Sequence, residues 1–119
     1  MENCIFCKIV KKELPAKIIF ENDEFLVFPP LNQVSKGHAL IIPKQHFENI
    51  FDFETKSLER IMGVAQKVAD DLVGENGATG INLLHASGKD AQQSVFHFHL
   101  HIVPRYKEDG LDLWLRNKL

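Results

Sequence analysis

The chain has few cysteines, little charge imbalance and no long hydrophobic run, and each shortage excludes a class of protein. Its 119 residues include only two cysteines, so a disulfide-stabilised secreted fold is not indicated. The formal net charge of −2 gives no electrostatic reason to expect nucleic acid or a membrane surface as a partner. The first residues, MENCIFCKIV, lack the basic and apolar regions of a secretory signal. No stretch approaches the roughly 18 apolar residues of a membrane span. We therefore expect a cytoplasmic protein.

Several motifs of nucleotide-binding proteins and hydrolases are also missing. The sequence has no Walker loop, no Gly-x-Gly-x-x-Gly and no Gly-x-Ser-x-Gly elbow. A standard nucleotide-binding fold and a serine hydrolase built on Ser94 are therefore not indicated. The apolar fraction of 45% suffices for an ordinary core, and the length fits one domain over residues 1–119.

The hydrophobic pattern predicts an α+β chain with a mostly antiparallel sheet, because strands and one long helix occur without βαβ alternation. Apolar residues recur three and four apart over 54–73, which predicts an amphipathic helix with Asp52 as its N-cap and Gly74 as its stop. Trp114 in the C-terminal tail would suit an arm that contacts a partner. The remaining predicted elements are a short helix over 4–10, a hairpin over 16–30 and strands over 38–43, 81–85 and 95–103.

Three histidines alternate with apolar residues in the stretch FHFHLHIV: His97, His99 and His101. Successive side chains of a strand point to opposite faces, so the three imidazoles would share one face at spacings of ~6.8 Å. That face must look into a pocket or into solvent, because three buried imidazoles would each need hydrogen-bond partners. The opposite face would pack against the long helix through Phe96, Phe98, Leu100 and Ile102.

The spacing of these histidines leaves three interpretations. They could belong to a solvated strand face, although strict alternation is unusual for one. They could hold a catalytic zinc ion. Alternatively, one neutral imidazole could be a nucleophile on phosphorus, with its neighbours orienting it and binding phosphate oxygens. Spacing alone does not choose between the second and the third.

The pair Cys4-x-x-Cys7 can supply two zinc ligands, and two histidines could complete a closed structural site. If the first histidine of the alternating run were one of them, the metal would fix the neighbouring imidazole in place. A thioredoxin-like redox pair normally has a βαβ context, which is absent here, so zinc is favoured.

A polar loop precedes the alternating histidines and carries Gly88, Lys89, Gln93 and Ser94. Backbone amides in such loops can form an anion nest, and a hydroxyl adds a further donor. An ordinary turn would explain the same composition, and it is the favoured interpretation when the loop is considered alone.

Together these stretches resemble the histidine triad (HIT) family. HFHLHIV, followed by PR, matches its His-φ-His-φ-His-φ-φ motif, where φ is apolar, and KGHALIIPKQH resembles its Gly-His-x-Leu-φ-Ile-Pro-Lys-x-His segment. QSVFH also matches, and NCIFCKIV resembles the N-terminus of zinc-bearing members. The matches run from residue 4 to about residue 106. The sequence is thus similar to the zinc-bearing, bacterial-type branch, close to the Hint nucleoside phosphoramidases.

The resemblance implies a HIT-like α+β fold: an antiparallel five-stranded sheet with one long helix and a short N-terminal helix. It implies a homodimer in which two sheets become continuous. The implied activity is that of a nucleotide hydrolase or transferase, of the purine nucleoside phosphoramidase or dinucleoside polyphosphate hydrolase type. Such an enzyme attacks the α-phosphorus of a purine nucleotide and forms a nucleotidyl-histidine intermediate. The alternative is a nucleotide-binding or interaction module with little catalysis.

The resemblance also implies a role for individual residues. His99 matches the nucleophile, His101 the contact to phosphate and leaving group, and His38 a further member of the histidine cluster. The other substrate-binding positions are Gly88, Gln93 and Ser94. The ligands of a structural Zn²⁺ match Cys4, Cys7, His46 and His97.

Three positions depart from the family pattern. Pro30 stands where an acidic residue commonly grips the ribose, Ala86 where an asparagine is common, and Gln92 where a glycine precedes the Gln-Ser pair. We therefore expect weaker or changed nucleotide selectivity. The candidates to replace the missing carboxylate are Asp23, Glu24 and Asn32.

Overall fold

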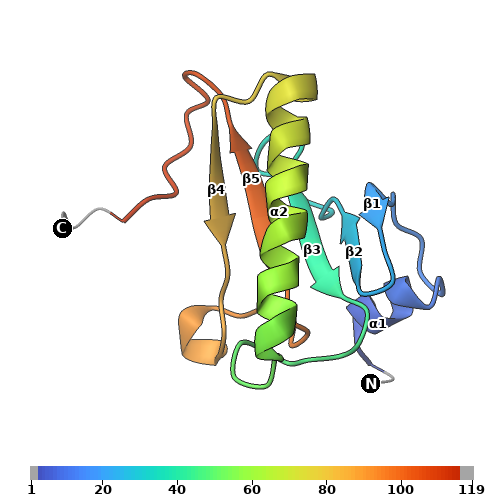
Figure 1. Ribbon diagram of the computed structural model, residues 1–119. Helices are drawn as coiled ribbons and strands as arrows, with labels where there is room; N and C mark the ends of the chain where they lie inside the picture. Colours follow the sequence, from blue (N-terminus) through green and yellow to red (C-terminus); the bar gives the residue numbers. More distant parts are fainter. Residues whose placement is uncertain (1–2, 116–119) are drawn as a thin grey trace.

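The computed structural model describes residues 3–115, which form a five-stranded sheet with a helix on each face (Figure 1). Every neighbouring pair of strands is antiparallel, in the order β1-β2-β3-β5-β4. This confirms the predicted fold class. The strands are β1 (Phe20–Glu21), β2 (Phe25–Phe28), β3 (Ala39–Pro43), β4 (Gly80–Leu84) and β5 (Leu100–Arg105).

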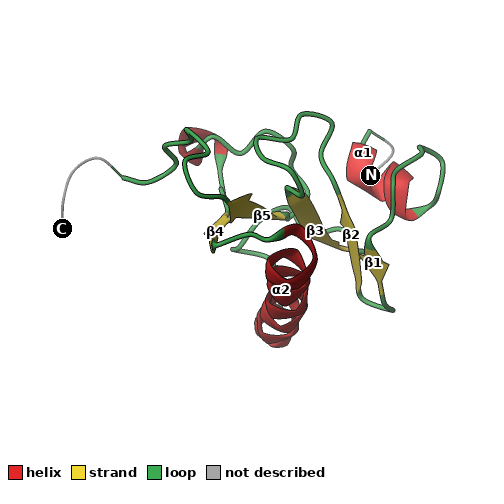
Figure 2. Cartoon of the chain, turned by 90° about the horizontal axis from the view of Figure 1, so that it is seen from above, coloured by secondary structure: helices red, strands yellow, loops and turns green. Residues whose placement is uncertain are grey.

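The two faces of the sheet have separate hydrophobic clusters, because successive side chains of a strand point to opposite sides. Val27 and Ile41 belong to the cluster under the long helix α2 (Thr55–Asn76). Leu26 and Leu40 belong to the cluster that packs with Phe6 of the short helix α1 (Ile5–Val10). Figure 2 shows α2 and α1 on opposite sides of the sheet. No helix within residues 3–115 is long and apolar enough to cross a membrane.

Helix α2 occupies the predicted region, but both predicted end signals are wrong. The N-cap is Glu54, and the Asp52 carboxylate instead accepts the backbone N–H groups of Glu48 and Asn49 at 2.9 Å each. These bonds lower the pKa of Asp52 and close the loop before the helix. At the other end the helix continues through Gly74 and stops at Gly77, whose φ of 77° gives the left-handed conformation that favours glycine.

The loop before β3 packs tightly against the end of α2 at Gly37. Its φ is 95°, and a Cβ atom there would lie 2.8 Å from Leu72 Cδ2 and 2.9 Å from Asn76 Nδ2. A side chain at this position would therefore require a strained backbone and a shift of the Leu72 and Asn76 side chains. The close approach fixes the backbone immediately before His38.

Strand β5 is displaced from its predicted position. It begins at Leu100, so His101 lies on the strand, whereas His97 and His99 lie in the segment that precedes it. The Phe98 N–H donates to the carbonyl of Phe47 at 2.6 Å, so this bond joins the segment to a loop. Phe98, like Leu100 and Ile102 of the strand, is buried under α2 as predicted. Phe96 is not, because its side chain is 45% exposed.

The C-terminal segment leaves the sheet after Arg105 and extends past β4 (Figure 1). The Arg105 guanidinium pairs with the Asp109 carboxylate and also donates to Asn82 Oδ1 and to the carbonyl of Leu111. These bonds fix the start of the segment. Trp114 lies beyond them, with 67% of its surface exposed.

Candidate active site and metal centre

The four predicted metal ligands lie together at the N-terminal end of α1. The ligand atoms of Cys4, Cys7, His46 and His97 all lie within 4.8 Å of one another. Cys4 is the N-cap of α1, and its Sγ accepts the backbone N–H of Cys7 at 3.3 Å. The Nδ1 atom of His97 lies 3.3 Å from Cys4 Sγ and 3.5 Å from Cys7 Sγ. His46 Nδ1 lies 3.3 Å from Cys7 Sγ.

The protonation pattern of this cluster fits a zinc ion. The Nε2–H of His97 donates to the carbonyl of Pro43 at 2.8 Å, which leaves the lone pair on Nδ1, the atom that faces the thiols. Burial lowers the pKa of His97 to about 4, so the ring is a neutral ligand at pH 7. Two imidazoles and two thiolates are a usual tetrahedral zinc set. Within residues 3–115 no other group of three or more metal-binding side chains is found.

The two cysteines are free, and the thiol of Cys7 resists ionisation. Burial raises the pKa of Cys7 to about 11, and the neighbouring Cys4 adds to the effect through a hydrogen bond and through its charge. Two adjacent thiolates repel each other without positive charge between them. A bound zinc ion would supply that charge and would cross-link α1 to the segments that carry His46 and His97.

His99 follows the metal ligand His97 by two residues, and its ring is held in one orientation. Its Nδ1–H donates to the carbonyl of His97 at 2.8 Å, so the lone pair resides on Nε2. The ring contacts Phe6 and His101, with centroid separations of 5.2 and 5.3 Å. Burial lowers the pKa of His99, which keeps the imidazole neutral.

The side chain of His99 is buried, at 7% exposure. Among the described residues, the one side-chain nitrogen or oxygen that is both enclosed and unpartnered is Ser35 Oγ. Within residues 3–115 the Nε2 atom of His99 makes no hydrogen bond. His99 therefore presents a lone pair from a ring that is held in one orientation.

His38 and His101 lie next to His99 and are joined by a hydrogen bond whose direction can be assigned. The backbone N–H of Val34 donates to His38 Nδ1 at 3.2 Å, which places the His38 proton on Nε2. That Nε2–H donates to His101 Nδ1 at 2.9 Å, so His101 carries its proton on Nε2. Burial lowers the pKa of His38, and it lowers the pKa of His101 to about 4, with His99 and His38 adding to the effect. The cluster therefore offers one lone pair, on His99, and one N–H, on His101.

The polar loop before the histidines is held by Gln93. This buried side chain accepts the backbone N–H of Gly88 at 2.7 Å and donates to the carbonyls of Glu48 and Val95 at 2.6 and 3.1 Å. The amide is therefore engaged within the protein. Ser94, by contrast, is exposed and lines a recess of about 490 Å³ beside Cys4.

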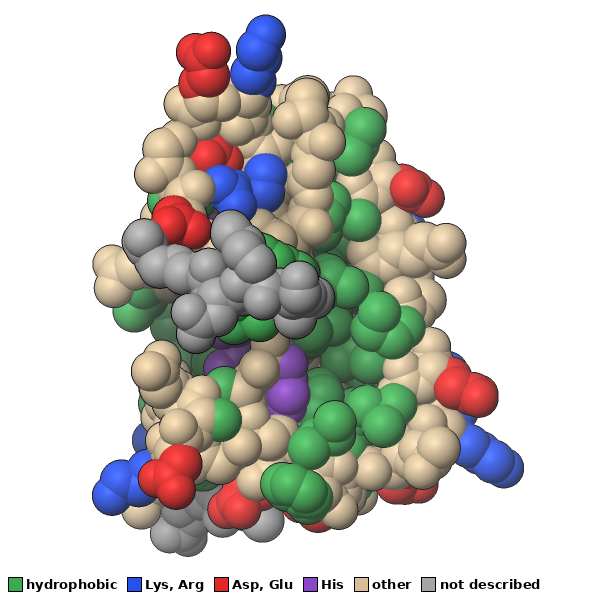
Figure 3. All heavy atoms as spheres, turned by 90° about the vertical axis from the view of Figure 1, so that its left-hand side faces the viewer, with side chains coloured by type: hydrophobic (Ala, Val, Ile, Leu, Met, Phe, Trp, Pro, Cys, Tyr) green, Lys and Arg blue, Asp and Glu red, His purple; other side chains and the backbone are tan. Residues whose placement is uncertain are grey.

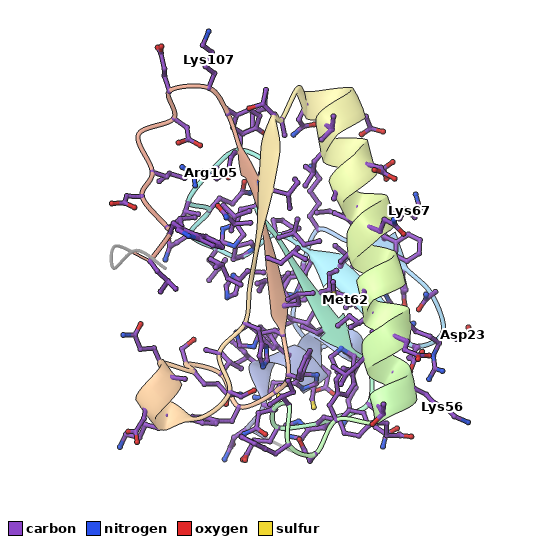
Figure 4. The ribbon with its side chains drawn as sticks, turned by 60° about the vertical axis from the view of Figure 1, so that its left-hand side comes forward. Asp23, Lys56, Met62, Lys67, Arg105 and Lys107 are labelled. Carbon is purple, nitrogen blue, oxygen red and sulfur yellow. The ribbon has the colours of Figure 1, made fainter. Side chains whose placement is uncertain are left out.

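The candidate replacements for the ribose carboxylate lie at different places. Glu24 is at the start of β2, where its carboxylate accepts hydrogen bonds from Arg60 and Ser57, whereas Pro30 follows the opposite end of that strand. Asp23 lies in the β1–β2 turn near the first turns of α2 (Figure 4). Asn32 is exposed in the loop after Pro30, and it is the candidate that remains.

Two residues of the site were not identified from the sequence. Phe6, between the two cysteines, contacts the rings of both His97 and His99, at centroid separations of 5.8 and 5.2 Å. His85, just after β4, donates from Nδ1 to the carbonyl of His99 at 2.9 Å. The Cys-x-x-Cys motif could have pointed to Phe6, whereas His85 had no signal beyond its place at the end of a predicted strand.

Comparison with known proteins agrees with this arrangement. Residues 11–108 match the HIT domain family. Protein hit of Bacillus subtilis is 43% identical over 110 residues, which cover 92% of this chain and 76% of that protein. Adenosine 5'-monophosphoramidase hnt1 of Schizosaccharomyces pombe is 37% identical over 107 residues, 90% of this chain and 77% of that protein. A crystal structure of a Zn-bound histidine triad family protein from Mycobacterium smegmatis has a TM-score of 0.90 at 35% identity, covering 94% of this chain and 81% of that one.

Proposed function

This chain belongs to the HIT domain family, and from that premise we propose that it is a nucleotide hydrolase of the purine nucleoside phosphoramidase type. The observation that carries the proposal is the pairing of opposite tautomers in one site: a lone pair on His99 Nε2 beside an N–H on His101 Nε2. The similarity to a protein named as an adenosine 5'-monophosphoramidase supports the choice of reaction.

The proposed reaction proceeds in two displacements. His99 Nε2 attacks the α-phosphorus, the phosphorus–nitrogen bond to the leaving amine breaks, and the amine departs with the electron pair. The His101 Nε2–H donates a hydrogen bond where negative charge develops. Water then displaces His99 and restores its lone pair. Over both steps one water molecule is consumed: a proton ends on the amine and hydroxide ends on phosphorus.

The residues around the histidines have distinct proposed roles in holding the substrate. Ser94, whose hydroxyl is exposed, donates to a phosphate oxygen, and the backbone of the loop at Gly88 contributes to the anion site. Gln93 shapes that loop, because its amide is already engaged. Pro30 offers no acceptor for the ribose hydroxyls, so we expect weak discrimination at the sugar.

The zinc site has a structural role in this proposal. Cys4, Cys7, His46 and His97 would hold the ion, while His99 is bonded through Nδ1 to a backbone carbonyl. A catalytic zinc held by all three alternating histidines does not fit, because His97 alone belongs to the metal cluster. Free thiols that serve as ligands suit a reducing compartment, and we propose the cytoplasm.

We also propose a homodimer built on the β4 edge. Within residues 3–115, β4 is the last strand of the sheet, so one side of its backbone has no neighbouring strand there. Beside it lies an open groove of about 650 Å³ between β4 and α2, lined by Met62, Gly63, Ala69, Ile81 and Leu83 among others. Met62 is on the side of α2 that faces β4 (Figure 4), and hydrophobic side chains cover much of this face (Figure 3). A second copy would pair its own β4 with this edge and fill the groove.

The proposal is tested by hydrolysis of adenosine 5'-phosphoramidate. We expect the wild-type protein to turn it over and His99→Ala to lose at least ~10³-fold in kcat while it stays folded and keeps its zinc. Lys56→Ala, an exposed change at the start of α2, is the control. Turnover by His99→Ala at the wild-type rate would refute the proposal. Binding of purine nucleotides without turnover of any leaving group would favour the interaction module, which the departures at Pro30, Ala86 and Gln92 make the second candidate.

A further inference from the structure

We propose that His85 is a positioning residue for His99 and that Ser87 holds His85 in the tautomer this role requires. The proposal rests on the proposed function, because it concerns how the nucleophile of that reaction is aimed. His85 lies directly after β4, and Ser87 follows two residues later. Neither residue belongs to the alternating histidines or to the metal cluster.

The hydrogen bonds of His85 have a fixed direction. Its Nδ1 atom lies 2.9 Å from the carbonyl oxygen of His99. A carbonyl can only accept, so Nδ1 carries the proton and Nε2 must be an acceptor. The Ser87 hydroxyl lies 2.5 Å from that Nε2 and donates to it.

The orientation of Ser87 is fixed by a third residue. The backbone N–H of Ile50 donates to Ser87 Oγ at 2.9 Å, so the single hydroxyl proton of Ser87 is free to point to His85. A directed chain of bonds therefore runs from the loop at Ile50 through Ser87 and His85 to the backbone of His99. Chains of this kind strengthen each bond that they contain.

The ring of His85 also packs against the segment that carries His99. It stacks on Phe98 with a centroid separation of 4.4 Å and an interplanar angle of 27°. Phe98 in turn packs on Phe53 at 4.2 Å, within the hydrophobic cluster under α2. His85 thus contacts the segment twice, once at a side chain and once at a carbonyl.

The segment needs such support because it lies outside β5 and so lacks the hydrogen bonds of a strand ladder. The His99 carbonyl belongs to the peptide plane that sets the direction of the His99 Cα–Cβ bond. Turning that plane would disturb the bond from His99 Nδ1 to the His97 carbonyl and would move Nε2 away from the phosphorus. Near-attack geometry is sensitive to shifts of this size. Loss of the His85 bond should therefore reduce kcat and leave KM nearly unchanged.

Two other roles for His85 do not fit its contacts. Both ring nitrogens are already bonded to groups of the protein, so neither is free to bind a metal or to exchange a proton with substrate. His85 is also outside the one group of metal-binding side chains found in residues 3–115. The remaining role is to hold His99.

Two variants of the zinc-loaded protein separate the hydrogen bond from the packing. His85→Phe keeps an aromatic ring on Phe98 and removes the donor, whereas His85→Asn loses the ring and keeps an N–H close to the position of Nδ1. We expect His85→Phe to lose at least about tenfold in kcat with KM within about twofold, and His85→Asn to stay within about threefold of wild type. Lys56→Ala, an exposed change at the start of α2, should leave both constants unchanged.

A second readout does not depend on activity. In ¹⁵N NMR spectra of the imidazole nitrogens, we expect wild-type protein and His85→Asn to show His99 with its proton on Nδ1 alone. His85→Phe should show exchange between the two tautomers. The proposal is overturned if His85→Phe keeps both the wild-type kcat and the single tautomer, or if the two variants lose activity equally. If the wild-type protein has no turnover, the proposed function fails, and the NMR comparison still decides the role of His85.

Discussion

At the scale of single residues, a hydrogen bond to a backbone carbonyl fixes the tautomer of two nearby histidines, but it fixes them in opposite forms. His97 and His99 each donate one ring N–H to a backbone carbonyl. His97 donates from Nε2, so its Nδ1 faces the two thiols as a metal ligand. His99 donates from Nδ1, so its Nε2 keeps a lone pair. Under the proposed function, the choice of carbonyl thus assigns His97 to the metal site and His99 to the attack on phosphorus.

The neutral state of His101 leads to a prediction about acid stability. Burial lowers the pKa of His101 to about 4, from an unfolded value of about 6.5. Below pH 6.5 the unfolded chain therefore binds more protons than the folded one, so the stability that the neutral ring contributes is complete above 6.5 and is lost as the pH falls towards 4. Protonation would also oppose the bond from His38, because His101 Nδ1 would become a donor.

We expect this single group to reduce the free energy of unfolding by up to ~1.4 kcal/mol per pH unit over that range. Urea unfolding of wild type and of His101→Asn at pH 7 and pH 5 measures the effect. The amide oxygen of the substituted side chain would still accept from His38, but the amide would not titrate, so the variant should lose less stability on acidification. Equal losses in the two proteins would contradict the assignment.

Pro30 leads to a prediction about the sugar. Because proline has no side-chain acceptor, we expect wild-type protein to hydrolyse the ribose and 2'-deoxyribose forms of adenosine phosphoramidate with kcat/KM values within about threefold. Pro30→Asp should raise the preference for ribose to about tenfold, since a hydrogen bond to a carboxylate contributes ~1.5–3 kcal/mol. Pro29→Asp adds the same charge one residue away and is the control. A strong ribose preference in the wild-type protein would show that another residue, such as Asn32, accepts from the sugar.

At the scale of elements, the sequence predicted the sheet and the long helix, because these depend on hydrophobic periodicity. It failed where the outcome depends on a distant partner. The alternation from Phe96 to Ile102 predicted a strand, yet only the residues from Leu100 onward belong to β5. Successive side chains of any extended segment point to opposite sides, whereas a strand also needs a neighbouring strand for its backbone. The Phe98 N–H bonds to the Phe47 loop instead. Likewise Gly74 and Gly77 are equivalent stop signals in sequence, and only Gly77 adopts positive φ.

In the candidate site, too, the sequence did not predict features that depend on a distant partner. The pair Cys4-x-x-Cys7 was sufficient to predict a zinc site, whereas His46 and His97 were identified as its other ligands only through the resemblance to the HIT family. The positions of Gln93 and His85 could not be predicted, because their bonds reach residues 45 and 14 positions away, respectively. Such contacts have no local pattern.

Removal of the metal site should weaken the attachment of α1. Cys4→Ala leaves three of the four donors, so we expect zinc to be lost and the melting temperature to fall. Activity should fall as well, because Phe6 of the same helix contacts the ring of His99. Metal analysis after purification, with His99→Ala as the control that keeps its zinc, is the measurement. Zinc retained by Cys4→Ala and lost by His99→Ala would instead favour a catalytic metal.

At the scale of the whole molecule, the sheet separates two environments. The α2 face carries the larger hydrophobic cluster, whereas the opposite face carries α1 and the metal cluster. The segment from His97 to His99 joins the two, because Phe98 is buried under α2 while the histidines flanking it contact Phe6 of α1. The segment that carries the candidate site is therefore packed against the core through Phe98 on one side and would be fixed by a bound metal ion on the other.

The proposed dimer has a matched test on α2. Met62 and Val73 are similarly exposed, at 48% and 50%, but only Met62 lines the groove beside β4. We expect Met62→Asp to convert a wild-type dimer into a monomer, because it would place a charge in a buried apolar contact. Val73→Asp should remain dimeric. Analytical ultracentrifugation at micromolar concentration measures the mass, and a dimeric Met62→Asp or a monomeric wild type would exclude this interface.

The covalent role of His99 is tested most directly by the stereochemistry at phosphorus. A substrate made chiral at its α-phosphorus and hydrolysed in isotopically labelled water reports how many displacements occur, because each in-line displacement inverts the configuration. Attack by His99 followed by attack of water gives two inversions, so the product should retain the configuration of the substrate. A product of inverted configuration would mean that water attacks the phosphorus directly, and His99 would not be the nucleophile.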